Sequence, residues 1–298
     1  MKRAIVAIFL VLWTPLVAGA QSNTRDTTPV RYGANPAAGR TFTHDGLTLY
    51  YETYGSGEPL LLIHGNGGSI GDFAAQIPFF RTRYRVIAMD SRDQGKSSDS
   101  SGSLTYEKMT DDLAALLDHL NTGPVNVVGW SDGGIEALLL GIRHPQKVKK
   151  IVAMAANLNP TDKAVQPEII AGVKKMIADM PATVRNTSQG RRELRVISIV
   201  LEQPNIDPRA LEKIIAPTLV LASDHDLIRD EHTVEIYHHL PNGRLAIFPS
   251  ATHMIPFDDP ATFNSTVERF LRTPLVTIDR VNDVFKSLEK MRATQARP

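Results

Sequence analysis

One stretch of the sequence combines the residue types and the spacing that nucleophilic chemistry needs. The β-branched run Val125–Val128 leads into Gly-x-Ser-x-Gly, whose serine is Ser131, and an apolar helical pattern begins at Ile135. A strand, a sharp turn and a helix in this order form a nucleophile elbow, which lifts the serine hydroxyl off the sheet. The free N–H groups and positive dipole end of the helix then face developing negative charge. We expect Ser131 to be a nucleophile; the alternative is an ordinary tight connection.

A serine hydroxyl needs a histidine base, and that base needs an acid to fix its tautomer. Of the nine histidines, His253 lies in the loop after the last expected strand and is our choice for the base. The acid should follow a strand between nucleophile and base, as Asp224 and Asp226 do. We prefer Asp226, with Asp224 capping the turn or accepting backbone N–H bonds. The chain order Ser131, Asp226, His253 is known for one enzyme architecture.

Two N–H groups must face the oxyanion of a tetrahedral intermediate, and the loss of one typically costs on the order of 3 kcal/mol. The elbow geometry provides the N–H of Asp132. The glycine-rich loop His64–Ser69 provides the second, for which we choose the N–H of Asn66. The alternative for this loop is an unspecialised turn.

Strands alternate with helices along most of the chain, which implies an α/β fold with a mostly parallel, doubly wound sheet. Expected strands, after an antiparallel hairpin at Thr41–Tyr54, are Leu60–Ile63, Arg85–Met89, Val125–Val128, Val148–Ala156, Pro217–Ala222 and Arg244–Phe248. Expected helices include Gly71–Phe80, Thr105–Leu120, Glu231–Leu240 and Pro260–Leu271. Such sheets bind ligands at the carboxyl ends of their strands, so the candidate residues should share one rim.

The expected organisation has six parts. Residues 1–20 form a signal peptide, with a basic start, a short apolar core and a small-residue site cut after Ala20. Residues 21–40 are a flexible lead-in, 41–156 and 217–273 the two halves of the core, 157–216 a small helical cap inserted over the site, and 274–298 a C-terminal helix and tail. The last helix is expected to dock on the body; binding a partner is the alternative. Cleavage would place the protein in the periplasm or outside the cell, and an uncleaved membrane anchor is the alternative.

Composition narrows the function classes. The 298 residues are 42% hydrophobic and 22% charged, with a formal net charge of +1, so no basic excess favours nucleic acid. The absence of cysteine excludes disulfides, thiolate metal sites and a cysteine nucleophile. We expect a small-molecule substrate, no metal or organic cofactor, and no stable membrane insertion after signal cleavage; the sequence does not fix the oligomeric state.

Five stretches between Phe42 and Leu271 together resemble the α/β-hydrolase fold family. They are His64-Gly65-Asn66-Gly67-Gly68, Asp90 to Ser97, Gly129-Trp130-Ser131-Asp132-Gly133-Gly134, Ser223-Asp224-His225-Asp226 and Thr252-His253. The resemblance implies a serine hydrolase of the carboxylic ester type (EC 3.1.1) that forms an acyl-enzyme through Ser131, His253 and Asp226. One departure is Arg92-Asp93, where the family often has Arg-Gly. Haloalkane dehalogenases and epoxide hydrolases carry aspartate where this chain has Ser131.

The elbow also resembles that of valacyclovir hydrolase-like enzymes, in which the aspartate matching Asp132 contacts the amino group of the substrate. By that resemblance Asp132 would bind α-amino esters; alternatively its side chain caps the helix or bonds a neighbouring loop. The resemblance leaves other activities open: a lactonase, a cofactor-free haloperoxidase, a C–C hydrolase, or a non-catalytic ligand-binding homologue.

Overall fold

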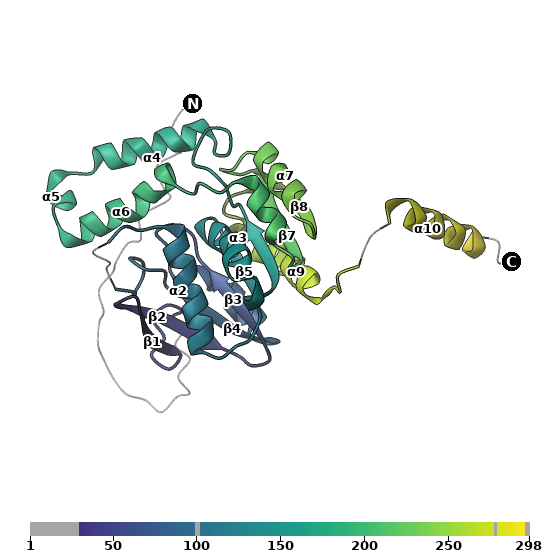
Figure 1. The fold of residues 1–298 in the computed structure, drawn as a ribbon, viewed down its shortest axis with the longest axis horizontal. Coiled ribbons are helices and arrows are strands. Elements are labelled where there is room, and N and C mark those ends of the chain that lie inside the picture. The colour runs from purple at the N-terminus through teal and green to yellow at the C-terminus, as the bar shows by residue number, and fades with distance from the viewer. Residues whose placement is uncertain (1–29, 99–101, 277–278, 296–298) are drawn as a thin grey trace. The chain divides into compact units, whose positions relative to one another are not determined.

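The computed structural model describes residues 30–98, 102–276 and 279–295, so the expected signal peptide lies outside the described residues. Within these residues the strands form one sheet in the order β1-β2-β4-β3-β5-β6-β7-β8 (Figure 1). Only β1 and β2 are antiparallel to their neighbours, as the hairpin pattern predicts. The strands are β1 Gly39–His44, β2 Leu47–Tyr54, β3 Glu58–Ile63, β4 Tyr84–Met89, β5 Val125–Trp130, β6 Val148–Met154, β7 Thr218–His225 and β8 Gly243–Thr252.

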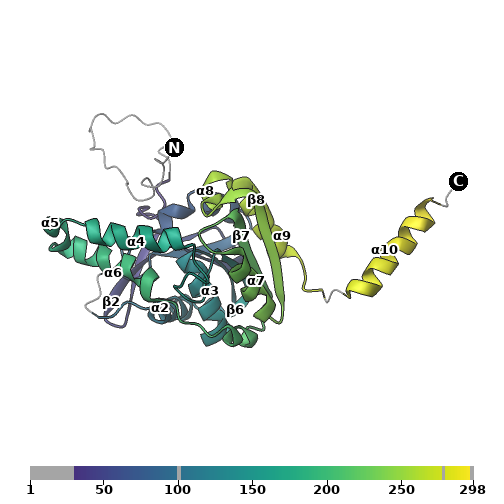
Figure 2. The same cartoon turned by 90° about the horizontal axis from the view of Figure 1, so that it is seen from above.

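Helices cover both faces of this sheet, because its central strands are apolar on both sides. In β3, Leu61 and Ile63 pack into one core with α2 and α3, while Leu60 and Leu62 pack into a second core with α9 (Figure 2). The helices of the body are α1 Gln76–Phe80, α2 Tyr106–His119, α3 Asp132–Arg143, α7 Asp230–His239, α8 Ile255–Asp258 and α9 Pro260–Arg272. The single helix expected over Gly71–Phe80 is instead a 3-10 turn, Ile70–Phe73, followed by α1, because Ser69 and Asp72 cap the turn separately.

The segment 157–216 contains α4 Pro167–Asp179, α5 Ala182–Arg185 and α6 Ser188–Glu202. Helices α4 and α6 lie side by side with α5 at their turn (Figures 1 and 2). Two arginines of α6 contact the loop after β4: Arg192 donates to the carbonyl groups of Asp93, Gly95 and Ser97, and Arg195 pairs with the Asp93 carboxylate at 3.3 Å. Asp93 has a φ of +64°, which suits the glycine common at this position, but here its carboxylate contacts the cap.

The described part of the expected lead-in is fixed to the sheet. Residues 21–29 of the expected lead-in lie outside the described residues, but the part from 31 to 38 is not loose. The N–H groups of Gly33 and Asn35 donate to the buried Glu52 carboxylate at 2.8 and 3.0 Å, so the segment is fixed to β2.

At the other end of the chain, α10 covers Arg280–Gln295. Its apolar side chains are exposed, which gives the expected docking of this helix no support; they include Val281, Val284, Phe285, Leu288 and Met291. Among the helices of the described residues, none is long and apolar enough to cross a membrane.

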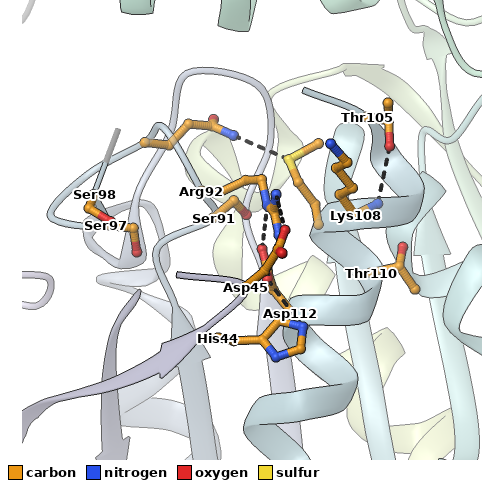
Figure 3. Close-up of polar contacts among 12 residues, drawn as sticks. His44, Asp45, Ser91, Arg92, Ser97, Ser98, Thr105, Lys108, Thr110 and Asp112 are labelled. Carbon is orange, nitrogen blue, oxygen red and sulfur yellow. Dashed lines mark hydrogen bonds and ion pairs between the residues drawn. The ribbon is translucent and has the colours of Figure 1, made fainter. Parts of the chain in front are cut away.

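A buried ion pair joins the loop after β4, helix α2 and the β1–β2 turn (Figure 3). Arg92 donates to both carboxylate oxygens of Asp112 on α2, at 2.6 and 2.7 Å, and approaches Asp45 of the β1–β2 turn at 3.5 Å. The Asp112 side chain is fully buried and that of Arg92 is 3% exposed. Burial raises the pKa of Asp112, and the hydrogen bonds from Arg92 oppose that rise.

We expect Arg92→Met to lower the free energy of unfolding by about 3–5 kcal/mol, because among the described residues it leaves the buried Asp112 charge with only the partly exposed His44 ring as an ionic partner, at 3.9 Å. Urea denaturation measures this. The double variant Arg92→Met/Asp112→Leu should recover most of the loss, since no charge then remains buried. A loss equal in the single and double variants would contradict this interpretation.

Candidate active site

Ser131 lies at the sharp turn between β5 and α3, in a backbone conformation that a serine rarely adopts, with φ +59° and ψ −122°. Its N–H donates to the Met154 carbonyl of β6 at 2.8 Å. The turn is possible because glycines let strand and helix approach closely. A Cβ on Gly129 would lie 1.9 Å from the Gly133 carbonyl oxygen, and one on Gly133 would lie 2.1 Å from that of Ile63.

The structure brings Ser131, His253 and Asp226 together from the loops after β5, β8 and β7. His253 Nε2 lies 3.0 Å from Ser131 Oγ, and His253 Nδ1 lies 2.6 Å from Asp226 Oδ1. The Asp226 side chain is fully buried, and backbone N–H groups of Ser223 and Leu227 donate to its two oxygens. With the imidazole proton on Nδ1 bound to Asp226, Nε2 is free to accept the serine proton.

Asp224, the second candidate acid, has a different position. Its exposed carboxylate accepts the N–H groups of Ser250 and Ala251, at 2.7 and 3.0 Å, just before His253. The bond from Ser250 first, then the hydrogen bond with the His225 ring and the bond from Ala251, lower the pKa of Asp224 to about 2. Asp224 therefore fixes the loop that carries His253, whereas Asp226 is the carboxylate bonded to the His253 imidazole.

Trp130 contacts the same loop, a role that we did not predict from the sequence. Its indole N–H donates to the His253 carbonyl at 2.9 Å, and its ring lies edge-on to that of Phe257. The position of Trp130 directly before Ser131 in the sequence could have indicated this role. His64, by contrast, is buried, and its Nε2 accepts the Ser91 N–H, so this rim histidine supports the loop after β4.

The loop after β3 passes directly against the nucleophile. A Cβ on Gly65 would lie 3.1 Å from Ser131 Cβ, and the Gly67 N–H donates to Gln94 Oε1 at 2.7 Å. Within the described residues, the N–H groups of Asn66 and Asp132 have no hydrogen-bond acceptor. Two donors are therefore free beside Ser131, as an oxyanion requires.

The Asp132 side chain does not point into open space. It is buried, Asn66 Nδ2 donates to its Oδ2 at 2.9 Å, and the Tyr106 hydroxyl lies near it. Burial raises the pKa of Asp132, while the bonds from Asn66 and Tyr106 lower it. This geometry is that of the second alternative, in which the carboxylate bonds a neighbouring loop.

A second carboxyl group lies one turn further along α3. Glu136 is 1% exposed, its Oε2 has no partner, and burial together with the Asp132 and Asp112 carboxylates raises its pKa well above the usual range. Sequence reasoning missed it, although a glutamate four residues after Asp132 in an otherwise apolar helix was a signal. In the described part of the chain, no three His, Asp or Glu side chains are grouped to hold a metal ion.

Comparison with known proteins agrees with this geometry. A family model described as alpha/beta hydrolase fold matches residues 58–192. Serine hydrolase BPHL of Mus musculus is 28% identical over 76% of this chain and 84% of its own length. The 3-oxoadipate enol-lactonase 2 of Acinetobacter baylyi is 25% identical over 78% of this chain and 96% of its own length.

Solved structures show the same fold. An alpha/beta hydrolase enzyme from a deep-sea metagenome library, MGS-M2, superposes with a TM-score of 0.70 at 21% identity, over 80% of this chain and 100% of its own. The enol-lactonase from Burkholderia xenovorans gives a TM-score of 0.68 at 18% identity, over 78% of this chain and 100% of its own. The sheet order, the serine elbow and these matches together show that the chain has the α/β-hydrolase fold.

Proposed function

We propose that this protein is a serine hydrolase that cleaves a carboxylic ester, or a related acyl bond, of a small molecule. The main support for this proposal is the continuous hydrogen-bonded path from Asp226 through His253 to Ser131. His253 Nε2 takes the hydroxyl proton as Ser131 Oγ attacks the carbonyl carbon, and the N–H groups of Asn66 and Asp132 stabilise the oxyanion. His253 then protonates the leaving alkoxide, and water releases the acyl group by the same route.

The relatives support this proposal at the level of reaction class. One is named a serine hydrolase and another an enol-lactonase. A lactone is a cyclic ester, so the same attack by Ser131 would open it, and lactones are the second substrate class that we propose. The sequence of residues 1–20 further supports removal of a signal peptide and action in the periplasm or outside the cell.

The protein starting at Gln21 should hydrolyse p-nitrophenyl acetate, butyrate or octanoate. Ser131→Ala should lower kcat by at least about 10⁴-fold, because the nucleophile is lost. Release of p-nitrophenol measures both, and Ser265→Ala, an exposed serine on α9, is the matched control. Equal turnover by wild type and Ser131→Ala would refute the proposed mechanism.

The two acidic residues should differ strongly. Asp226→Asn should lower kcat by about 10⁴-fold, because His253 loses the partner that fixes its tautomer. Asp224→Asn should lower it by less than about tenfold, since the loop keeps its other contacts. The Asp224 pKa is depressed, so its bonds to the loop persist above about pH 4 and weaken only as pH falls toward 2. A larger loss in Asp224→Asn than in Asp226→Asn would reverse the assignment.

Because the Asp132 carboxylate is buried and already accepts the Asn66 amide, we expect it not to select amino esters. Asp132→Asn should leave unchanged the ratio of kcat/KM between p-nitrophenyl esters of 2-aminobutyric and butyric acid. Parallel assays of the two esters measure this ratio. A selective loss for the amino ester would show instead that Asp132 binds the substrate amine.

A further inference from the structure

We propose that the side chains of Asn66 and Asp132 form a bridge that holds the two oxyanion N–H donors at a fixed separation, and that helix α6 of the cap completes this bridge. The inference rests on the proposed function. It makes Asp132 a positioning residue through its side chain, in addition to the N–H that it provides. It also makes the cap part of the machinery that stabilises the transition state.

Both protons of the Asn66 amide are committed. Nδ2 lies 2.9 Å from Asp132 Oδ2 and 2.7 Å from the carbonyl oxygen of Val196 on α6. A primary amide nitrogen has two protons, so these bonds saturate it and define the orientation of the whole side chain. These bonds fix the position of the Asn66 Cα, and this in turn sets the direction of the Asn66 backbone N–H.

The loop that carries Asn66 has little stiffness of its own, because Gly65, Gly67 and Gly68 surround it. Asp132, in contrast, begins α3 directly after the nucleophile and is buried. One buried hydrogen bond therefore ties the flexible half of the oxyanion site to its rigid half. Such a bond is stronger in a buried site than in water.

Two further side chains lie beside the Asp132 carboxylate. The Tyr106 hydroxyl of α2 lies close enough to oppose the burial that raises the pKa of Asp132. Glu136 of α3 is buried, and its pKa is raised well above the usual range. The carboxylate that accepts the Asn66 amide thus has a defined position before any substrate binds.

The link to Val196 extends this bridge into the cap. Val196 is buried on α6, and Arg192 and Arg195 of the same helix contact residues 93–97 of the body. Gln94 of that loop in turn accepts the Gly67 N–H, next to Asn66. Helix α6 therefore reaches the oxyanion loop twice, directly through Val196 and indirectly through the loop after β4.

The test uses Asn66→Ala and Asp132→Ala, which remove the bridge but keep both backbone N–H groups. Complete loss of an oxyanion donor costs about 10²–10³ in kcat, so loss of its positioning should cost about 10–100-fold. The KM for p-nitrophenyl butyrate should change by less than about threefold, because the bridge acts on the transition state. The double variant should lose no more than the worse single variant, since both remove the same contact.

A second readout separates positioning from a merely structural effect. A trifluoromethyl ketone forms a tetrahedral adduct with Ser131 and fills the oxyanion site, so its inhibition constant should rise by the same factor as kcat/KM falls. Asn264→Ala is the matched control: Asn264 is a buried residue of α9, and its amide donates to the Ala75 carbonyl rather than to a residue of the site. It should lower thermal stability comparably and leave both constants unchanged.

The outcomes are distinguishable. If wild type hydrolyses the esters but both bridge variants keep its kcat and ketone affinity, the bridge has no effect on positioning and the inference is wrong. Additive losses in the double variant would also overturn it. If wild type hydrolyses no ester and the ketone does not bind, the proposed function fails, and the inference fails with it.

Discussion

The strained turn at Ser131 is the constraint on which the rest of the site depends. A positive φ at a serine costs of order 1–3 kcal/mol and persists only where the surroundings hold it. Here β5 lies between β3 and β6, and the Ser131 N–H bonds to Met154. The close contact of Gly133 with the Ile63 carbonyl then brings the end of β3 beside the nucleophile. The oxyanion loop starts where it does because of that contact.

Buried carboxyl groups perform different tasks according to their partners. Asp226 accepts backbone N–H bonds and holds His253, whereas Asp112 is paired with Arg92 and joins segments of the scaffold. Asp132 faces the oxyanion loop, and Glu136 beside it is buried and has a raised pKa. The same residue type thus orients a base, stabilises the fold or positions a loop, depending on which donors the backbone brings near it.

Sequence patterns predict much of this because the relevant signals are local. The glycines around Ser131 and the apolar strands define the elbow and the parallel sheet, and strand ends place His253 and Asp226 on one rim. What the sequence does not reveal are bonds between distant segments. The donation from Asn66 to Val196 joins residues 130 positions apart, and the anchoring of Gly33 by Glu52 depends on β2 lying beside the lead-in. No periodicity reports such contacts.

The most direct test of the central claim is covalent labelling with a fluorophosphonate, followed by peptide mass spectrometry. A serine activated by His253 should take up one phosphonyl group on the peptide that contains Ser131, with loss of fluoride. His253→Ala should remain unlabelled on the same timescale, because the base that removes the hydroxyl proton is absent. An adduct on another residue, or equal labelling of Ser131 with and without His253, would contradict the account.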